Sequence, residues 1–334
     1  MLNIGIIGYG YWGPNLVRNF LKVNNCDVTA IADGNSIRRD NIKKTYPNIK
    51  LFEDGNKLID DITINAVVIA TPVFTHYSLA KKALQSGKHV LLEKPMTSSV
   101  SEAEELISLA NKLGLTLMVD HTFLYTSAVQ KIKEIVDNNN IGLLKYFDST
   151  RINLGLFQPD INVLWDLAPH DISILSFIFP ELPYSVNATG ISHTSNNIEN
   201  IAYLTMNYNS NFIAHINCSW TSPVKVRQTL IGGDSKMIVY NDLEPSEKIK
   251  IYDTGYTHKN NIDNNSILVD YRIGDVYLPK LNNQEALYGV AVDFCNTIIN
   301  NTEPLSSSKL GLDVVKILEA ANASIKNNGK EIKL

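Results

Sequence analysis

The chain has 334 residues, of which 44% are hydrophobic and 19% charged, and its formal net charge at pH 7 is −4. This length suits about two domains of ~100–200 residues each, and the composition suits a globular protein with a sizeable core. A small negative charge is not typical of nucleic-acid-binding proteins, which carry a strongly basic face, so we expect no nucleic-acid partner.

Three cysteines, Cys26, Cys218 and Cys295, lie far apart in the sequence. Their odd number and the lack of a C-x-x-C pair argue against a disulfide framework or a zinc site, so reduced thiols and no metal site are predicted. The first residues run into glycines without a basic stretch, unlike a signal peptide, and no apolar run approaches the ~20 residues of a membrane helix. We therefore expect a cytoplasmic protein with no membrane partner.

The first 120 residues alternate short apolar runs with amphipathic segments, which predicts a doubly wound parallel sheet. Strands are expected at Leu2–Ile7, Asp27–Ala32, Ala66–Ala70, His89–Leu92 and Leu115–Val119. Apolar residues at helical spacing predict helices at Asn15–Leu21, Thr75–Ser86 and Ser98–Leu113.

The pattern changes after a helix expected at Leu124–Asn138. Apolar residues then alternate with polar ones along Lys145–Asn153, Tyr184–Ile191, Asn200–Tyr208, Asn211–Trp220, Val224–Gly232 and Lys236–Tyr240. This period of two predicts a large, mostly antiparallel open sheet with one buried face. One helix interrupts the sheet after Trp165, and two more close the chain at Gln284–Asn300 and Ser308–Asn327. The Asn-rich stretch His258–Asn265 predicts a surface loop.

The first predicted strand runs directly into a glycine-rich turn, Gly8-Tyr9-Gly10-Tyr11-Trp12-Gly13, which opens a helix. In such a G-x-G-x-x-G turn the first glycine allows the tight bend, the second lets the backbone approach a pyrophosphate, and the third packs helix against strand. The helix N-terminus then offers N–H groups and partial positive charge to the phosphates. Residues 1–120 are therefore predicted to form a dinucleotide-binding Rossmann domain.

About 20 residues after the glycines, Asp33 ends the second predicted strand. A carboxylate at this place binds the adenosine ribose hydroxyls and repels the 2′-phosphate of NADP, so NAD is the favoured cofactor. NADP stays open as the alternative, because Arg38 and Arg39 follow closely and an arginine can hold that phosphate.

Three further motifs follow along the chain: Ala70-Thr71-Pro72 with His76, then Glu93-Lys94-Pro95, then a D-x-x-x-H pattern formed by Asp166 and His170. The first two lie at the carboxyl ends of predicted parallel strands, where doubly wound sheets bind ligands. The third lies where the helix of the second half is expected to begin.

Together, the glycine turn and these motifs resemble the glucose-fructose oxidoreductase/inositol dehydrogenase (Gfo/Idh/MocA) family, and the likeness reaches the Pro304-Leu305 … Gly311-Leu312 segment. The resemblance implies NAD- or NADP-dependent oxidation or reduction of a carbinol carbon on sugars, inositols or nucleotide-linked sugars. It also implies that residues 121–334 form a second domain that binds substrate and joins subunits, so we expect a homodimer or homotetramer. The terminal helices of that domain can pack back on the first.

The resemblance assigns catalytic roles to Lys94, Asp166 and His170. Oxidation of a secondary alcohol removes a hydride from carbon and a proton from oxygen, so some group must take that proton. His170 suits this role because an ordinary histidine titrates near ~6.5. Lys94 is the alternative acceptor, and as a cation it would stabilise developing alkoxide charge. Asp166 would orient His170 or bind a sugar hydroxyl.

Each catalytic candidate has a structural alternative: a surface lysine, a helix cap with Pro169 in the first turn, and a buried histidine. The full set predicted for the cofactor is Gly8, Gly10, Tyr11, Trp12, Gly13, Asp33, Thr71, Pro72, His76, Glu93, Lys94 and His121. For His76, packing is an equal alternative. The set predicted for the substrate is Lys94, Tyr125, Arg151, Asn153, Asp166 and His170.

The stretch from Arg151 to Asp171 resembles family members encoded with surface-polysaccharide and nucleotide-sugar genes, among them the UDP-N-acetylglucosaminuronate 3-dehydrogenase type. This likeness implies oxidation of a sugar C3 hydroxyl. Arg151 and Asn153 are expected to face the pocket from the sheet edge, where an arginine suits a carboxylate or diphosphate. A sheet-surface arginine is the alternative.

Two other functions remain open. A free-sugar or inositol dehydrogenase would need no diphosphate-binding cations, and Arg151, Lys225 and Arg227 argue against it. A ligand-sensing regulator of the same fold would need no catalytic groups, and the intact set of Lys94, Asp166 and His170 argues against that.

Overall fold

The computed structural model describes residues 1–258 and 269–334, which form two compact units. The first unit comprises Met1–Thr126 and Gln284–Lys316, and the second comprises Ser127–Asn283 and Ile317–Leu334. The segment Gln284–Lys316, which the boundary after residue 120 assigned to the second domain, thus groups with the first unit. Aromatic packing is one reason, because Phe294 of helix α8 (Ala286–Asn300) meets Phe20 edge to face, with ring centroids 6.3 Å apart.

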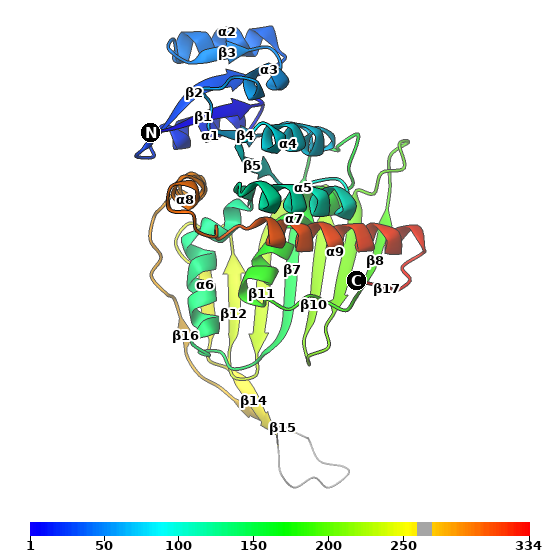
Figure 1. Cartoon of the computed structure of the whole chain (residues 1–334). Helices are drawn as coiled ribbons and strands as arrows, with labels where there is room; N and C mark the ends of the chain where they lie inside the picture. Colours follow the sequence, from blue (N-terminus) through cyan, green and yellow to red (C-terminus); the bar gives the residue numbers. More distant parts are fainter. Residues whose placement is uncertain (259–268) are drawn as a thin grey trace. The chain divides into compact units, whose positions relative to one another are not determined.

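The first unit is built on a parallel sheet whose strand order is β3-β2-β1-β4-β5-β6 (Figure 1). The strands are β1 (Leu2–Ile7), β2 (Cys26–Ala32), β3 (Lys50–Phe52), β4 (Ala66–Ile69), β5 (His89–Glu93) and β6 (Leu117–Asp120). The direction of strand addition reverses between β1 and β4, which is the topological switch point where doubly wound sheets bind ligands. The predicted Rossmann class is confirmed.

Helices connect these strands. They are α1 (Gly13–Phe20), α2 (Ser36–Thr45), α3 (Gly55–Ile59), α4 (His76–Gln85) and α5 (Val100–Leu113), with 3-10 turns η1 (Val73–Thr75) and η2 (Thr122–Tyr125). Ser99 caps α5 by accepting a hydrogen bond from the Glu102 amide, and Gly114 ends that helix in the left-handed conformation at φ +65°. The amide of Arg38 likewise donates to Asn35, which caps α2.

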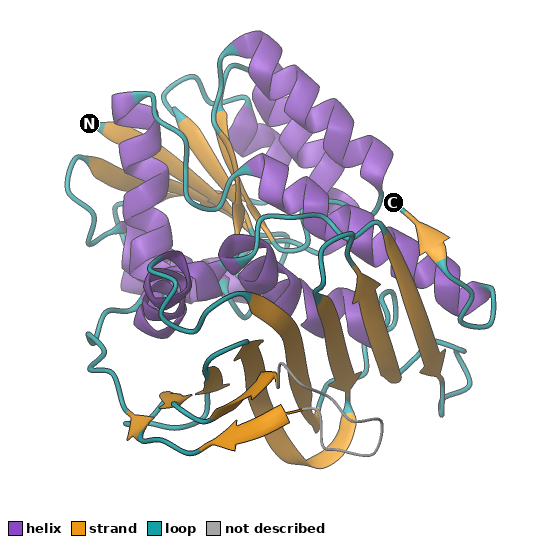
Figure 2. Ribbon diagram, turned by 90° about the horizontal axis from the view of Figure 1, so that it is seen from below, coloured by secondary structure: helices purple, strands orange, loops and turns teal. Residues whose placement is uncertain are grey.

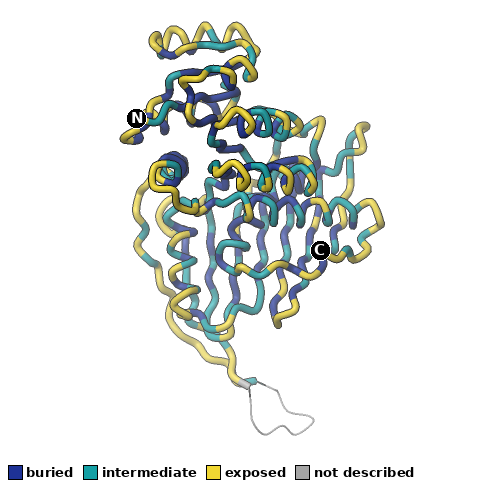
Figure 3. The backbone as a smooth tube through the Cα atoms, in the orientation of Figure 1, coloured by how far each residue is buried: buried dark blue, intermediate teal, exposed yellow. Residues whose placement is uncertain are grey.

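The parallel strands form the core of this unit. Ile4, Ile6, Val67, Leu91 and other residues on both faces of β1, β4 and β5 have no exposed surface (Figure 3). Burial on both faces is the physical reason for the continuous apolar runs that identified these strands in the sequence. The described helices include none long and apolar enough to cross a membrane.

The second unit contains the large sheet, with strand order β16-β13-β12-β11-β7-β10-β9-β8-β17. Its strands are β7 (Leu144–Leu154), β8 (Ser185–Ile191), β9 (Ile201–Asn207), β10 (Ile213–Ser219), β11 (Thr221–Gly233), β12 (Met237–Asn241), β13 (Ile249–Tyr252), β16 (Val276–Tyr277) and β17 (Ile332–Lys333). Pairing is antiparallel except between β10 and β7. This matches the predicted mostly antiparallel sheet.

A separate hairpin pairs β14 (Gly255–His258) with β15 (Val269–Arg272). The Asn-rich stretch His258–Asn265 was predicted as a surface loop. Except for His258, it lies outside the described residues.

Helices lie on one face of the large sheet (Figure 2). They are α6 (Ser127–Asp137), α7 (Val163–Ile178) and the part of α9 (Ser308–Lys326) that belongs to this unit. Alternation along β7 shows the two faces, because Phe147 and Arg151 are buried whereas Asp148 and Thr150 are only partly buried. Among the described residues of this unit, no helix covers the opposite face of the sheet.

Helix α7 begins two residues earlier than predicted. Asn162 caps it by accepting a hydrogen bond from the Trp165 amide, so Asp166 is not the cap. The helix continues through Pro169. Asp166 and His170 are therefore one turn apart on the same helical face.

Candidate functional site

Two glycines of the glycine-rich turn are required by the fold. Gly8 has φ +97°, and a Cβ added to it would lie 2.5 Å from the backbone oxygen of Ala70. A Cβ on Gly13 would lie 2.6 Å from the backbone oxygen of Gly8. Because both neighbours are backbone, side chains at these positions would force the turn apart.

Gly10 differs from its two partners. The one atom within 4 Å of a Cβ added there is a guanidinium nitrogen of Arg38, at 3.8 Å. Packing within the protein therefore does not require glycine at this position. Its small size instead lets a ligand approach the backbone, which is the role of the second glycine in dinucleotide-binding turns. Gly10 lines a hollow of about 730 Å³ at the carboxyl ends of β1, β2 and β4.

Asp33 lies in the wall of the same hollow and is 8% exposed. Its carboxylate accepts hydrogen bonds from the amides of Tyr9, at 2.7 Å, and Asn35, at 2.8 Å. The carboxylate therefore ties the glycine turn to the end of β2. The hollow thus combines an acidic acceptor with an open backbone cradle, which fits the ribose and pyrophosphate of a dinucleotide.

The two arginines that kept NADP open have different surroundings. A guanidinium nitrogen of Arg38 lies 3.4 Å from the Asp33 carboxylate, and this side chain lines the hollow. Arg39 donates to the backbone oxygen of Asp33 at 2.7 Å. Arg38 is therefore the arginine that a ligand in the hollow would meet. Thr71 and Pro72, also predicted to bind the cofactor, line the hollow too.

His76 differs from the cofactor contact predicted for it. It is fully buried, and its ring nitrogens lie 3.0 Å from the Pro95 carbonyl oxygen and 2.9 Å from that of Thr71. Burial lowers the pKa of His76, while hydrogen bonds to the backbone oxygens of Thr71 and Pro95 oppose this shift. We conclude that His76 braces the loop after β4 against the loop after β5 from behind the pocket wall.

At the ends of β5 and β6, two carboxylates occupy neighbouring positions. Glu93 pairs with Asp120 in the register of these parallel strands, so both side chains project from the same face of the sheet. Asp120 is 2% exposed, and one of its oxygens accepts a hydrogen bond from the Thr122 hydroxyl at 2.7 Å. Its other oxygen is buried and has no hydrogen-bond partner among the described residues.

The pKa values of both carboxyl groups are raised. Burial, followed by repulsion from Asp120, raises the pKa of Glu93 to about 8, while the nearby Lys94 ammonium opposes this shift. Burial raises the pKa of Asp120 to about 6, against the hydrogen bond from Thr122 and the charge of Lys94. Both carboxyl groups are therefore harder to ionise than ordinary ones, and the positive charge of Lys94 favours their ionised forms.

His121 directly follows Asp120 and is 1% exposed. Neither ring nitrogen has a hydrogen-bond partner among the described residues. Burial, followed by the positive charge of Lys94, lowers the pKa of His121 to about 3, so this imidazole is neutral. Buried polar atoms without partners cost free energy, and at a ligand edge they suit an incoming amide or hydroxyl.

The aromatic candidates of the first unit have contrasting environments. Tyr125 donates a hydrogen bond to Asp293 at 2.6 Å and accepts one from the Ser306 amide at 3.2 Å. Its hydroxyl is thus engaged within the unit. Tyr11 and Trp12 are 85% and 45% exposed on the glycine turn, with their rings edge to face.

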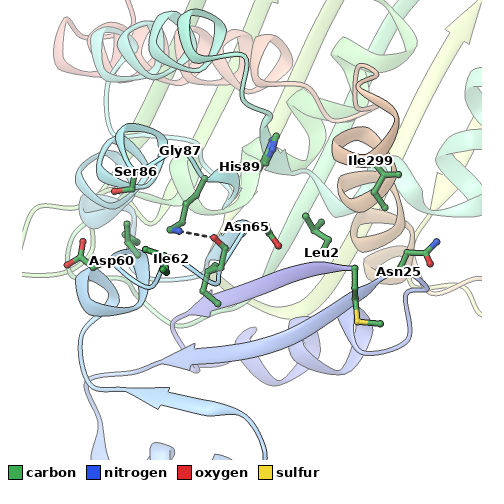
Figure 4. Close-up of a pocket in the computed structure, with 13 residues that line it drawn as sticks. Leu2, Asn25, Asp60, Ile62, Asn65, Ser86, Gly87, His89 and Ile299 are labelled. Carbon is green, nitrogen blue, oxygen red and sulfur yellow. Dashed lines mark hydrogen bonds between the residues drawn. The ribbon is translucent and has the colours of Figure 1, made fainter.

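A second, larger hollow of about 930 Å³ lies at the opposite, amino-terminal edge of the same sheet (Figure 4). Leu2, Asn65 and His89, at or just before the starts of β1, β4 and β5, contribute to its wall. Lys88, which also lines it, donates to the backbone oxygens of Asp61 and Ile64. Doubly wound sheets bind ligands at the carboxyl edge, so this hollow is not the cofactor site.

In the second unit, Asp166 is held by an indole. Trp220, which is 1% exposed, donates from Nε1 to the Asp166 carboxylate at 2.9 Å. Trp220 lies between β10 and β11, so this bond links α7 to the sheet. His170 is partly exposed on the same face of α7 as Asp166.

The expectation that Arg151 faces a substrate anion is wrong. Arg151 is 3% exposed, and two of its guanidinium nitrogens donate to the Asp171 carboxylate at 2.7 and 2.9 Å. Arg151 lies on the helix-covered face of β7, where an unpaired charge would be costly, and Asp171 satisfies it. This pair therefore anchors α7 next to His170.

The other residues predicted near the substrate have mixed positions. Asn153 follows Arg151 by two residues on β7, so it shares the helix-covered face, and it is partly exposed near the strand end. Arg227 donates to Asp242 at 3.3 Å. Lys225 is exposed on β11. Arg227 thus already has an acidic partner within the chain.

Sequence reasoning missed three residues of these clusters. Asp120 ends its strand without a motif, and only the β5–β6 register shows that it adjoins Glu93. Trp220 bonds to Asp166, and Asp171 bonds to Arg151. In each pair the two residues lie far apart in the sequence. The sequence did contain a signal for Asp171. This acid directly follows the predicted site residue His170, so it was a possible partner for any cation near that site.

We expect a substitution at Gly13 to affect stability and a substitution at Gly10 to affect cofactor binding. Gly13→Ala should lower the melting temperature, since its Cβ would meet backbone 2.6 Å away, whereas Gly10→Ala should melt near the wild type. Gly10→Ala should nevertheless weaken NAD⁺ binding, because the added methyl group occupies the ligand's path. Thermal melts and calorimetric titration measure both effects. Normal NAD⁺ affinity in Gly10→Ala would contradict the placement of the cofactor.

Comparison with known proteins agrees with this geometry. A family model described as the oxidoreductase family with an NAD-binding Rossmann fold matches residues 2–121. A second model, for the Gfo/Idh/MocA C-terminal domain, matches residues 129–239. The two matches together cover well over half of the chain.

Among similar proteins, an oxidoreductase of Escherichia coli, YdgJ, is 31% identical over 54% of this chain and 54% of its own length. The scyllo-inositol 2-dehydrogenase (NADP⁺) IolW of Bacillus subtilis is 26% identical over 62% of this chain and 60% of its own. A UDP-N-acetylglucosamine 3-dehydrogenase of Acidithiobacillus ferrooxidans is 27% identical over 65% and 67%. The matched regions thus span about half to two thirds of these relatives.

The structure of the Acidithiobacillus ferrooxidans enzyme, GnnA, superposes with a TM-score of 0.80 at 22% identity, covering 97% of this chain and 98% of that one. This likeness extends the agreement in fold beyond the matched sequence segments. With the NAD-binding Rossmann unit and the open-sheet unit both matched by their family models, the chain belongs to the Gfo/Idh/MocA oxidoreductase family.

Proposed function

We propose that the chain is an NAD-dependent dehydrogenase that oxidises a secondary hydroxyl, at C3, of a nucleotide-linked sugar for surface-polysaccharide synthesis. The observation that carries cofactor use is the hollow where the open cradle at Gly10 adjoins the Asp33 carboxylate. The relative named as a UDP-N-acetylglucosamine 3-dehydrogenase supports the substrate class and the position oxidised.

When bound, NAD⁺ supplies the acceptor for the hydride that leaves the carbinol carbon. The residues of this chain then have to bind the sugar and take the hydroxyl proton. We assign the proton to His170, with Asp166 one helical turn away on the same face of α7. Trp220 holds the Asp166 carboxylate, and the Arg151–Asp171 pair anchors the helix beside His170.

Lys94 has a different part in this proposal. It follows β5 at the carboxyl edge of the Rossmann sheet, beside Glu93 and Asp120. As an ammonium group there, it would stabilise the negative charge that develops on the substrate oxygen as the proton leaves. Its neighbours Glu93 and His121 would meet the nicotinamide half of the cofactor.

A free-sugar or inositol dehydrogenase is the second candidate, and a specific observation favours it. The diphosphate argument used Arg151, Lys225 and Arg227, but Arg151 is bound to Asp171 and Arg227 to Asp242. Only Lys225 of these three is exposed. The relative named scyllo-inositol 2-dehydrogenase is of comparable identity, at 26%. A regulator without catalysis would leave Lys94, Asp166 and His170 without a function.

The direct test is a turnover screen at 340 nm with NAD⁺ and two panels, one of UDP-sugars and one of free sugars and inositols. NADH formation with a UDP-sugar, and a 3-keto product identified by NMR, is the result expected. Turnover confined to free sugars or inositols would select the second candidate. Cofactor binding without turnover of either panel would favour the regulator.

With a substrate in hand, two variants separate the roles of His170 and Lys94. His170→Ala should lower turnover by ~10²–10⁴-fold, the usual contribution of a general base, and should flatten the acidic limb of the pH profile. The limb exists because a protonated base cannot accept the proton as pH falls. Lys94→Ala should slow turnover but keep that limb. Loss of the limb only in Lys94→Ala would make the lysine the proton acceptor.

We further propose that the chain assembles as a homodimer or homotetramer through the open face of the large sheet. Tyr203 and Ile213, on neighbouring strands of that face, are 47% and 49% exposed. Ile213 lies opposite Asn207 and Tyr203 opposite Asn217, so these two exposed apolar side chains are spread along the face, where a second subunit would cover them. Light scattering at micromolar concentration should give a multiple of the chain mass, and Ile213→Glu should shift it toward one chain. A monomeric wild type would contradict this proposal.

A further inference from the structure

The carboxyl pair formed by the partly exposed Glu93 and the buried Asp120 lies on the side of the sheet that takes the nicotinamide half of a dinucleotide. Asp33 ends β2 and Gly10 follows β1, so the adenosine half and the pyrophosphate belong to that side of the switch point. The other mononucleotide half then lies over β4, β5 and β6. Glu93 and Asp120 end β5 and β6 on that side, at the same register position.

Among the described residues of the first unit, Lys94 and Tyr125 are titratable groups that interact with this pair. Lys94 is the cation that acts on both carboxyl groups. His121, next in the chain, stays neutral because burial lowers its pKa to about 3. Burial, followed by the charge of Asp293, raises the pKa of Tyr125, so its hydroxyl is neutral as well. Lys94 therefore balances one negative charge of the pair but not two.

We propose that Glu93 and Asp120 act as one proton-sharing pair that senses the charge of the nicotinamide ring, so that NAD⁺ binding expels the shared proton and NADH binding does not. This inference rests on the cofactor binding of the proposed function. It also gives a role to Asp120, which belongs to no motif of the chain. The Asp120 carboxylate acts through Glu93, because its negative charge raises the pKa of Glu93.

Electrostatics fixes the direction of the effect. The nicotinamide ring of NAD⁺ carries a positive charge, and that of NADH is neutral. A cation near the pair stabilises its doubly ionised form, so it lowers the pKa of the second ionisation. By linkage, a ligand that lowers this pKa binds more tightly as pH rises toward the pKa of the free protein, which is about 8 for Glu93.

The proton balance is simple. On NAD⁺ binding, the O–H bond of the protonated carboxyl group breaks, the electron pair stays on the carboxylate, and the proton goes to solvent. After hydride transfer the ring is neutral, so the pair regains a proton. The pair is thus a second site, besides the base that takes the hydroxyl proton, whose protonation changes during the reaction.

The test measures dissociation constants of NAD⁺ and NADH from pH 6.0 to 9.0 by calorimetry, without any sugar. For the wild type, NAD⁺ should bind several-fold more tightly at pH 8.5 than at pH 6.5, with ~10-fold as the upper limit for a second pKa lowered by one unit. NADH affinity should change much less. At pH 7.5, titrations in two buffers of different ionisation enthalpy should show a proton released with NAD⁺ and none with NADH.

Asp120→Asn is the diagnostic variant. Asparagine keeps an oxygen that accepts from Thr122, but it removes one ionisable group, so Glu93 loses a repulsive neighbour and ionises at lower pH. NAD⁺ affinity should then be flat above pH 7, and proton release at pH 7.5 should be lost. Asp27→Asn, an exposed acid on β2, changes the net charge equally and should retain the wild-type pH dependence.

Retained NADH binding shows that Asp120→Asn is folded. If this variant does not bind NADH, Glu93→Gln replaces it in the test, because that change should also abolish proton release. The inference is overturned if NAD⁺ and NADH share one pH dependence in the wild type, or if Asp120→Asn still releases a proton. Either result leaves cofactor use intact. A wild type that binds neither cofactor would overturn the proposed function together with this inference.

Discussion

Parallel pairing of β1, β2, β4, β5 and β6 places the carboxyl ends of these strands on one edge of a single sheet. Gly8 and His121 therefore lie at the same edge of the sheet, although they are 113 positions apart in the chain. The strands themselves are buried on both faces and make the edge rigid. The cofactor site follows from this constraint, because each loop needs only to present a suitable group where its strand ends.

Buried polar side chains differ in whether they have hydrogen-bond partners among the described residues. His76 lies between two carbonyl oxygens, and Arg151 is held by Asp171, so both have their partners within the chain. One Asp120 oxygen and both His121 nitrogens are buried without a partner among the described residues. Because unsatisfied buried atoms are costly, we propose that the ends of β5 and β6 are a place for ligand contacts.

In the second unit, by contrast, the charged groups around His170 have partners within the chain. Its Asp166 receives a hydrogen bond from Trp220, and its Arg151–Asp171 pair is almost completely buried. Both contacts connect α7 to the sheet within one turn of His170. Breaking one partner of a buried ion pair typically costs ~3–5 kcal/mol, so these contacts hold the helix firmly. A fixed helix is what a proton acceptor needs, since proton transfer depends on hydrogen-bond distance.

Local patterns predicted the elements well where burial dictates the residues. The predicted limits of β1 are those of the structure, because the last four of its six residues are buried and the first two are partly buried. Helix α2 was not predicted, since Ile42 is its one buried residue and its polar surface leaves no apolar period. The three residues of β3 are too few to show a period. The glycine turn, Thr71-Pro72 and Glu93-Lys94 were visible because they lie at or near strand ends, whereas Asp166 and His170 lie within α7.

Pairing between distant side chains was beyond the sequence. Nothing in the residues around Arg151 shows that its guanidinium meets Asp171 and not a substrate, because this depends on how α7 packs on β7. Likewise, His76 required knowledge of two loops that follow different strands. Asp120 became visible only through strand register. These contacts are set by tertiary packing, which a single sequence does not specify.

The choice of NAD over NADP depends most on Asp33 as the acceptor for an unmodified adenosine ribose. Calorimetric titration of the wild type at pH 7 with NAD⁺ and with NADP⁺ tests this directly. Repulsion between the Asp33 carboxylate and a 2′-phosphate should make NAD⁺ bind at least ~10-fold more tightly, a difference of about 1.4 kcal/mol. Tighter binding of NADP⁺ would contradict the account and would place Arg38 on the phosphate in place of Asp33 on the ribose.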